Sequence, residues 1–366
     1  MKNNILEKIS YFTKKKYKSL RSSVFLSIYG KLVISKKPPK TKFKLLRDTN
    51  SKDFLRYKYK FFEMSDGRVF TDNIENVSII SKNKLLDKFS YQQIKGKLVG
   101  SKKNQVISTG TPKFILKLNK SLAILAQGAS GYNYFAHFLF DIIPKIKLFS
   151  LAINLKKIDY FYFSKLNKYQ KDIFGIIGID KRKIIDSNKY RHLQCKTIYG
   201  VTHPSYFKGT FSYAQSYMPA WIIDHLKKKF LKYKRSTNNF KKVFIDRSDS
   251  KLKHCKLINN NEIKRFLKSK GFKIITLSNL NFKKQISIFN NAEIIVGPHG
   301  AGFANLVFCK KNTKVIELRP KNHPNRVYER VSGINKLNYK LIKLKHIKNN
   351  KKGDIFLKKE ILNNYI

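Results

Sequence analysis

The chain has 366 residues, about twice the size of a typical domain, so we expect two packed units and exclude a single small module. Hydrophobic residues make up 42% and aromatic residues 13%, which excludes a disordered chain. Lys and Arg outnumber Asp and Glu by 78 to 22, a formal net charge of +56, which is typical of partners such as nucleic acid or an anionic membrane. Because 66 of the 78 basic residues are Lys, a solvated Lys-rich surface is the alternative, and we favour it.

The three cysteines are Cys195, Cys255 and Cys309, which form no CxxC pair and no zinc-type spacing with histidine. Neither a disulfide framework nor a metal site is predicted, and reduced thiols fit a cytosolic compartment. The first residues, MKNNILEKISYFTKKKYKSL, lack the apolar core of a secretory signal, and no window reaches the ~18 apolar residues of a membrane span. We therefore expect a cytoplasmic protein, and leave open a peripheral contact with the membrane face.

Residues 1–60 form a basic segment with partly helical spacing of apolar positions, which meets a breaker at Pro38 and Pro39. Such a helix either lies on anionic lipid or covers the edge of a domain, and we favour the second interpretation. Residues 61–233 are expected to form an N-terminal α/β domain. From residue 121 strand-like and helical segments alternate, in the order 121–126, 131–152, 158–163, 168–178, 183–186, 197–203 and 219–234. Strand followed by helix, repeated, predicts parallel βαβ units.

The polar, basic stretch 234–242 is the expected linker to a C-terminal domain over 243–345. This domain shows the clearest pattern of the chain, with strands at 242–246, 272–277, 293–297 and 313–318, helices at 259–271 and 281–292, and a turn into a short helix at 299–308. It reads as a Rossmann-like half with about four strands. Residues 346–366 are a tail, expected to include a helix that packs back on the N-terminal domain. Two Rossmann-like α/β domains in series are therefore predicted, with a ligand at the carboxyl ends of the second domain's strands.

The turn VGPHGAGFAN (296–305) lies between a predicted strand and helix. Gly300 and Gly302 let a ligand approach the backbone closely, and the N–H groups at the start of a helix suit a phosphate. The alternative is a glycine turn required only by sterics. His299, directly before Gly300, either contacts the ligand or bonds a carbonyl. The spacing matches neither GxGxxG nor the P-loop, so neither a dinucleotide fold nor an ATPase is indicated.

Arg247 follows the strand VFID directly, at the end of the sheet where an open α/β domain binds its ligand. In a chain so rich in Lys, an Arg at this position indicates a need for bidentate phosphate bonds. An ion pair with Asp246 or Asp249 is the alternative. Glu317 ends the strand KVIEL, where its carboxylate can accept bonds from ribose hydroxyls, cap a neighbouring group or pair with Arg319.

Asn133, His137 and Asp141 are spaced four apart and form a polar stripe on an otherwise aromatic helix. Polar groups in such surroundings need partners or a cavity. Two interpretations follow. The more usual one is that the three side chains hydrogen-bond one another within the core, and the other is that they act as general acid or base and bind a hydroxyl.

Taken together, YNYFAHFLFDIIPKI (132–146), FIDRSD (244–249), the segment 271–308 with Gln285 and GPHGAG, and VIELRP (315–320) resemble glycosyltransferase family 61, which includes capsular polysaccharide biosynthesis proteins. The resemblance covers about residues 125–320. It departs at CKLINNNE (255–262), with Lys256 where the family often has Arg and Asn260 where Glu is common.

The resemblance implies a metal-independent, inverting transferase of the two-domain GT-B type, with no cofactor, that moves a sugar from a nucleotide donor to a hydroxyl of a glycan or lipid-linked glycan across a cleft between the domains. By position, the donor-binding residues are Arg247, His299, Gly300, Ala301, Gly302 and Glu317. His137 and Asp141 are the implied catalytic residues, with Asp141 as base or orienting carboxylate, and Asn133 lies on the acceptor side. The rival interpretations are a nucleic-acid binder that uses the +56 charge, for which no recognition motif is found, and a non-catalytic protein that binds sugar nucleotides.

Overall fold

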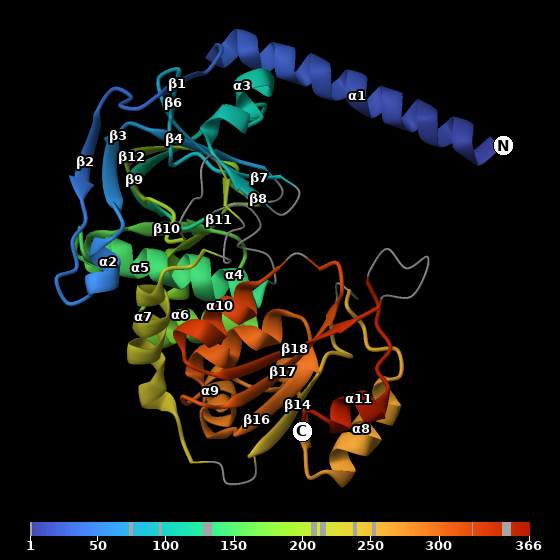
Figure 1. Ribbon diagram of the computed structural model, residues 1–366. Helices are drawn as coiled ribbons and strands as arrows, with labels where there is room; N and C mark the ends of the chain where they lie inside the picture. The colour runs from blue at the N-terminus through green and yellow to red at the C-terminus, as the bar shows by residue number, and fades with distance from the viewer. Residues whose placement is uncertain are drawn as a thin grey trace. The chain divides into compact units, whose positions relative to one another are not determined.

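The computed structural model describes residues 2–72, 76–94, 97–126, 134–205, 211–212, 217–236, 240–250, 254–323, 325–345 and 353–366. The chain divides into two compact units. The first comprises residues 1–133, 145–166 and 180–214, and the second comprises residues 134–144, 167–179 and 215–366. Each unit is built on its own large sheet (Figure 1).

A ten-stranded mixed sheet forms the first unit. Its strands are β1 (Val33–Ser35), β2 (Thr41–Leu45), β3 (Lys60–Ser65), β4 (Arg68–Thr71), β5 (Val77–Ser81), β6 (Lys84–Leu86), β9 (Leu116–Ile124), β10 (Tyr160–Phe163), β11 (Ile184–Asp186) and β12 (His192–Val201). Eight of them follow the order β1-β6-β5-β4-β12-β9-β10-β11, while β3 pairs with β12 and β2.

The predicted parallel βαβ units are confirmed in one half of this sheet, where β9 pairs in parallel with β10 and β12, and β10 with β11. In the other half β2–β3, β3–β12, β12–β4, β4–β5 and β5–β6 are antiparallel. Only Lys82 and Asn83 separate β5 from β6, and a two-residue loop is too short for a parallel crossover. The prediction of a Rossmann-like first domain is therefore wrong, and the sheet is mixed.

The other elements within or leading out of the first unit are short, apart from the N-terminal helix. They are α1 (Lys2–Tyr29), α2 (Lys52–Leu55), η1 (Ser101–Lys103), α3 (Val106–Thr109), η3 (Leu155–Lys157), η4 (Lys181–Lys183) and a small sheet of β13 (Phe211–Ser212), β8 (Lys97–Val99) and β7 (Gln92–Ile94). Helix α5 (Ile143–Ser150) starts in the second unit and ends in the first. The central core of the first unit packs side chains of β3, β9, β10 and β12, among them Phe62, Leu122, Tyr162 and Ile198.

A five-stranded, fully parallel sheet forms the second unit, in the order β15-β14-β16-β17-β18. Its strands are β14 (Lys242–Asp246), β15 (Lys273–Thr276), β16 (Ile294–Pro298), β17 (Lys314–Pro320) and β18 (Asn338–Leu344). Counted along the chain the order is 2-1-3-4-5, a doubly wound order whose direction reverses between β14 and β16. Ligands of such sheets bind at the carboxyl ends of the two strands at the reversal.

Helices cover both faces of this sheet (Figure 1). They are α7 (Ala220–Phe230) continued by η5 (Leu231–Tyr233), α8 (Asn260–Ser269), η6 (Leu277–Asn279), α9 (Phe282–Asn291), η7 (Ala301–Phe308), α10 (Val327–Ile334) and α11 (Lys359–Asn363). Because strand side chains alternate between faces, Phe244, Val296 and Ile316 share a core with α8, whereas Ile245 lies under η7. In the part of the chain described, none of the helices combines the length and apolar character needed to cross a membrane.

The described part of the C-terminal tail, residues 353–366, packs in the second unit, which corrects the prediction that the tail returns to the N-terminal domain. Ile355, Leu357 and Leu362 are fully buried in the same core as Phe244, and Ile355 pairs with Leu257 in a parallel bridge. The apolar residues of the tail complete the face of the nearest sheet.

Three helical segments predicted for the first domain cluster with the second unit instead: α4 (Phe135–His137) with the π-helical turn η2 (Phe138–Ile142), α6 (Lys168–Ile177) and α7. Aromatic contacts explain the difference. The ring centroid of Phe282 on α9 lies 6.2 Å from that of Phe135 and 5.1 Å from that of Phe230. Residues 237–239 of the expected linker lie outside the described residues.

Candidate functional site

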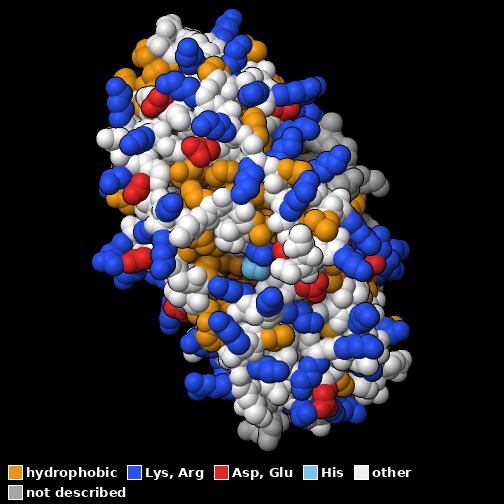
Figure 2. Space-filling model, turned by 90° about the vertical axis from the view of Figure 1, so that its left-hand side faces the viewer, with side chains coloured by type: hydrophobic (Ala, Val, Ile, Leu, Met, Phe, Trp, Pro, Cys, Tyr) orange, Lys and Arg blue, Asp and Glu red, His pale blue; other side chains and the backbone are white. Residues whose placement is uncertain are grey.

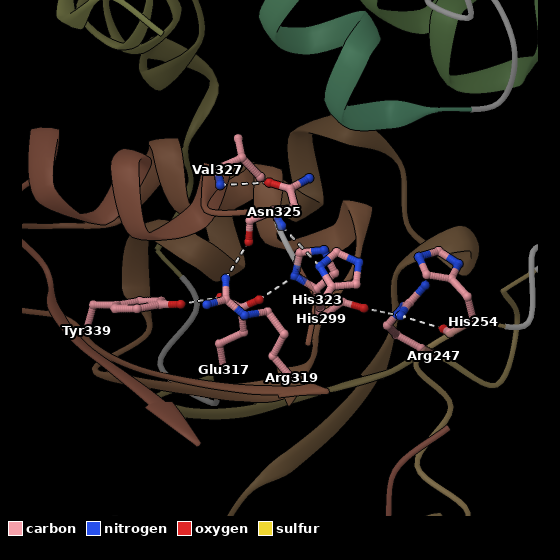
Figure 3. Close-up of polar contacts among 9 residues, drawn as sticks. All are labelled: Arg247, His254, His299, Glu317, Arg319, His323, Asn325, Val327 and Tyr339. Carbon is pink, nitrogen blue, oxygen red and sulfur yellow. Dashed lines mark hydrogen bonds and ion pairs between the residues drawn. The ribbon is translucent and has the colours of Figure 1, made fainter. Parts of the chain in front are cut away.

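Arg247 stands at the carboxyl end of β14, one of the two strands at the reversal of the sheet. Its side chain is partly buried. Nη1 donates to the carbonyl oxygens of His254, at 3.2 Å, and of His299, and Nη2 donates to Ser250 Oγ at 3.1 Å (Figure 3). These acceptors fix the guanidinium between the ends of β14 and β16 without neutralising it.

Asp246, the residue beside Arg247, has other partners. Its carboxylate accepts from Asn260 Nδ2 at 2.9 Å and from Lys264 Nζ at 3.1 Å. Burial alone would raise the pKa of Asp246, but these bonds and those from Ser248 outweigh it and hold the pKa below its ordinary value. Among the described residues no carboxylate lies within ion-pair distance of Arg247, so the predicted alternative of an ion pair with Asp246 or Asp249 is not what the structure shows. Burial lowers the pKa of Arg247 because it disfavours the charged form, and an anionic ligand would stabilise that charge.

Gly300 leaves room for the Arg247 side chain. A Cβ on Gly300 would lie 2.2 Å from the Arg247 guanidinium carbon, far inside van der Waals contact. Its backbone is extended, with φ 165°, which any residue adopts, so a larger residue here would displace Arg247 and leave the backbone unstrained. Ala301 and Gly302, which begin η7, are partly exposed and leave their side of the turn accessible.

His299 directly follows β16 and is held by a buried carboxylate. Its Nδ1 bonds Glu317 Oε1, and Tyr339 donates its hydroxyl to Glu317 Oε2 (Figure 3). Because a carboxylate accepts, this bond assigns a proton to Nδ1, and the other ring nitrogen, Nε2, takes part in none of the hydrogen bonds found among the described residues. Burial, and then the Glu317 charge, raise the pKa of Tyr339, which keeps it a hydrogen-bond donor.

Glu317 therefore acts differently from the expectation of a ribose contact. Its side chain is fully buried and both oxygens are already bonded, and no described bond joins it to Arg319. It orients His299 and is a positioning residue.

Three residues that sequence reasoning did not select also lie at this edge: His254, His323 and Arg319 (Figure 3). The His323 ring lies 4.2 Å from the His299 ring, centroid to centroid, and Arg319 donates to the carbonyl of Asn325. Burial, reinforced by neighbouring cations, lowers the pKa of His254 to about 4 and that of His323 to about 3. Arg319 and His323 lie at and just beyond the carboxyl end of β17. The same reasoning that selected Arg247, its position at the carboxyl end of a strand, could have selected them from the sequence.

His137 and Asp141 form a direct pair, with 2.7 Å between Nδ1 and Oδ2. Asp141 is buried, whereas His137 keeps a quarter of its side chain exposed, at 26%. The pair spans the widened turn η2. Pro144 has no N–H to give to the Phe140 carbonyl, and its ring crowds that oxygen, which favours such a turn immediately before it. Asn133 lies outside the described residues.

The segment that carries this pair is joined to the glycine turn within the second unit. Helix α4 lies against η7. Gln285 of α9 holds the same region by donating to the carbonyls of Leu277 and Leu280, both at 3.1 Å, and by accepting from Asn305 Nδ2 at 2.9 Å. The His137–Asp141 pair and the glycine turn are therefore supported by one packed layer.

Comparison with protein families finds a match to the glycosyltransferase 61 model over residues 135–316. The chain belongs to glycosyltransferase family 61. The matched region contains both His137 and Asp141 and the edge formed by Arg247 and His299, and it ends one residue before Glu317. Family 61 membership confirms the predicted resemblance and makes glycosyl transfer the class of activity.

A search of curated proteins finds no significant match to this family 61 chain. Among solved structures, it is similar to the dodecameric iron-containing heptosyltransferase TibC in complex with ADP-D-beta-D-heptose. The two are 11% identical over 87% of this chain and 84% of that chain, with a TM-score of 0.29. A likeness this weak supports no inference about the family 61 chain. Among its described residues, no three His, Cys, Asp or Glu side chains are grouped so as to hold a metal ion.

Proposed function

We propose that the protein transfers a sugar, with inversion and without a metal ion, from a nucleotide-sugar donor to a hydroxyl of a glycan or lipid-linked glycan, in the synthesis of a surface or capsular polysaccharide. The observation that carries the proposal is Arg247, a partly buried cation at the reversal of the second sheet, bonded to two carbonyls and a hydroxyl. A diphosphate is the ligand whose charge and geometry match it.

On the donor side, breaking the bond between the sugar and the diphosphate moves an electron pair onto the leaving phosphate oxygen. The negative charge that develops is met by Arg247, by the first N–H groups of η7 and by His299 with a proton on Nε2 as well as on Nδ1, since only that form donates from both nitrogens. Glu317 and Tyr339 contribute by fixing the His299 ring before the donor arrives. Fixed donors cost no reorganisation at the moment of reaction, which is where electrostatic stabilisation is most effective.

On the acceptor side, the His137–Asp141 pair supplies the base. It takes the proton of the acceptor hydroxyl while the hydroxyl oxygen attacks the anomeric carbon on the side opposite the diphosphate, which inverts that carbon. The 2.7 Å contact with a buried Asp141 supports this role, because such a carboxylate orients His137 and stabilises its protonated form. The donor edge and the His137–Asp141 pair both belong to the second unit, and its doubly wound sheet is the feature that supports a GT-B type of donor-binding half.

We place the enzyme in the cytoplasm at the inner membrane face, where lipid-linked acceptors are accessible. Support comes from α1, which carries seven basic residues and one acidic residue and whose residues 10–20 are all exposed. Lys and Arg also spread over the whole face shown in Figure 2 instead of gathering in one patch, which favours a solvated basic surface over a nucleic-acid groove on that face.

The test of the donor site is Arg247→Lys, with Arg265→Lys on the exposed face of α8 as the matched control. Lysine keeps the charge but loses the planar fork, so affinity for nucleoside diphosphates should fall about 10-fold to 100-fold, the equivalent of one charge-assisted bond. The melting temperature should change little in both variants. Unchanged affinity and turnover in Arg247→Lys would remove Arg247 from the donor site and refute the proposal.

A further inference from the structure

A hollow of about 550 Å³ lies in the first unit, and none of its lining residues belongs to the candidate functional site. It is formed where α1 approaches α3 and the ends of β4 and β12. Four basic side chains line it: Lys18 and Arg21 from α1, Lys113, and Arg191. Lys113 and Arg191 also line an adjoining hollow of about 320 Å³.

The carboxylate that lines this hollow already accepts hydrogen bonds from other groups. Asp72 is the one acidic residue that lines it, and its carboxylate accepts from the Asn76 backbone N–H at 3.0 Å, from Asn76 Nδ2 at 2.8 Å and from Gln105 Nε2 at 3.0 Å. In the described part of the chain, the ion pairs found involve none of the four basic residues. Four like charges around one hollow repel one another unless an anion enters. A phosphate group would offset the positive charge of these side chains, and its several oxygens could accept hydrogen bonds from them.

We propose that this pocket holds the phosphate of an anionic lipid headgroup and fixes the first unit to the membrane surface. The position of Arg21 connects the pocket to a lipid-facing surface. Arg21 lies three residues before Val24 and seven before Ile28, so these three share one side of α1. The pocket therefore opens beside the exposed apolar side of the helix.

That side of α1 is apolar and uncovered. Tyr17, Leu20, Val24 and Ile28 are each about half exposed or more, and Leu20 reaches 68%. The adjoining side of the same turns is packed, since the Phe25 ring meets the Phe114 ring edge-on with 5.0 Å between ring centroids. Figure 1 shows the earlier turns of α1 running out beyond α3. A helix with exposed apolar residues and a net charge of +6 combines the two contributions, apolar burial and attraction to anionic lipid, that hold a helix in a membrane interface.

A soluble phosphate has the same head chemistry but would leave this apolar side in water. Because a membrane would cover this apolar side, we infer that the phosphate belongs to a lipid. The proposal rests on the proposed membrane location and is independent of the donor site, because every residue in it belongs to the first unit.

The test is sedimentation of the full-length protein with vesicles of phosphatidylglycerol or of phosphatidylcholine. The pocket variant is Lys18→Gln with Lys113→Gln, and the control is Lys14→Gln with Lys15→Gln, which removes the same charge from exposed positions of α1 outside the pocket. The wild type should sediment with phosphatidylglycerol only. The pocket variant should bind about tenfold more weakly than the control variant, since charge-assisted bonds exceed the diffuse attraction of a surface Lys. Equal losses in the two variants would refute the pocket.

A second variant, Leu20→Ser with Val24→Ser, distinguishes a lipid phosphate from a soluble phosphate as the ligand. It should lose vesicle binding while keeping its affinity for glycerophosphoglycerol, the soluble headgroup of phosphatidylglycerol, measured by calorimetry, because only the apolar side has changed. If the pocket variant loses affinity for this headgroup but the second variant still sediments with vesicles like the wild type, the site is one for a soluble phosphate and the lipid proposal is wrong. Melting temperatures establish that each variant is folded. Vesicle binding is measured without a donor, so the proposed glycosyl transfer can fail without affecting this result.

Discussion

At the scale of single residues, the packing of Arg247 on Gly300 is the contact on which the proposed donor site depends most. Gly300→Ala places a methyl group 2.2 Å from the guanidinium carbon, so the arginine must leave its position between the two strands. We expect nucleoside diphosphate affinity to fall about as far as in Arg247→Lys, by one charge-assisted bond or 10-fold to 100-fold. Affinity is measured by calorimetry and folding by thermal melting.

The control for this variant is Gly175→Ala in α6, where an added Cβ meets nothing within 4 Å. Alanine at a helical glycine should leave stability unchanged or raise it by about 0.5–1 kcal/mol, without effect on binding. Full diphosphate affinity in Gly300→Ala would mean that the donor does not need Arg247 where the structure has it.

Residue identity at this edge was only partly predictable from the sequence. Arg247 and His299 follow buried strands directly, so strand periodicity was enough to place them at one edge. Tyr339 comes from the strand β18, and His254 from a loop, and only the folded chain shows that their neighbours are Glu317 and Arg247. The role of Glu317 could not be predicted because it depends on Tyr339, a partner 22 residues away in the chain.

At the scale of elements, the turn η2 carries the acid–base hypothesis. In Asp141→Asn, His137 keeps a hydrogen-bond partner but loses the charge that orients it and stabilises its protonated form. We expect kcat to fall by about 10²-fold or more, the usual contribution of a general base, with donor affinity near normal. Turnover, donor affinity and melting temperature are measured on the same preparation.

The matched control is Asp159→Asn in the first unit, where the carboxylate accepts from the backbone and hydroxyl of Ser121 at 2.9 and 2.8 Å. This change should lower stability and leave kcat per folded molecule unaltered. An Asp141→Asn enzyme that melts early yet turns over normally would return His137 and Asp141 to the core network that the sequence left as the alternative.

Element boundaries were predictable where burial follows a simple period. The strand over 242–246 agrees with β14, and the helix over 281–292 contains α9. Strand β18 was missed because its sequence, NYKLIKL, does not alternate strictly between apolar and polar residues. Lys340 and Lys343 are three residues apart, on opposite faces of this edge strand, and both are exposed. In the first sheet, the antiparallel pairings of β12 with β3 and with β4 join strands more than 100 residues apart in the chain, and pairing at such a distance is not encoded in local periodicity.

At the scale of the whole molecule, the sequence has no Asp-x-Asp pair to hold a divalent ion on a diphosphate. We therefore expect transfer to continue at an unchanged rate in excess EDTA, measured as release of the nucleoside diphosphate. A metal-dependent glycosyltransferase assayed in parallel should stop under the same conditions. Loss of transfer that manganese restores would show that the diphosphate is met by a cation bound elsewhere, and Arg247 would lose its proposed role.

Each unit contains buried or partly buried histidines whose protonation opposes folding. Both units should therefore lose stability as pH falls. Burial is the main cause in each: it lowers the pKa of His192 to about 4, that of His254 to about 4 and that of His323 to about 3. In the unfolded chain these groups return to the ordinary histidine value of about 6.5. Between pH 6.5 and about 4 the unfolded chain therefore binds protons that the folded chain does not.

The sign of the effect follows directly. The stability contributed by these neutral histidines is complete above pH 6.5 and is lost as pH falls through that window. The melting temperature should accordingly decline steadily from pH 7 to pH 4.5, and His254→Asn should make the decline shallower, because it removes one proton taken up on unfolding. A melting temperature that stays level from pH 7 to pH 4.5 in the wild type would mean that these imidazoles are protonated in the folded state, and the cationic edge beside Arg247 would then carry more charge than the structure assigns to it.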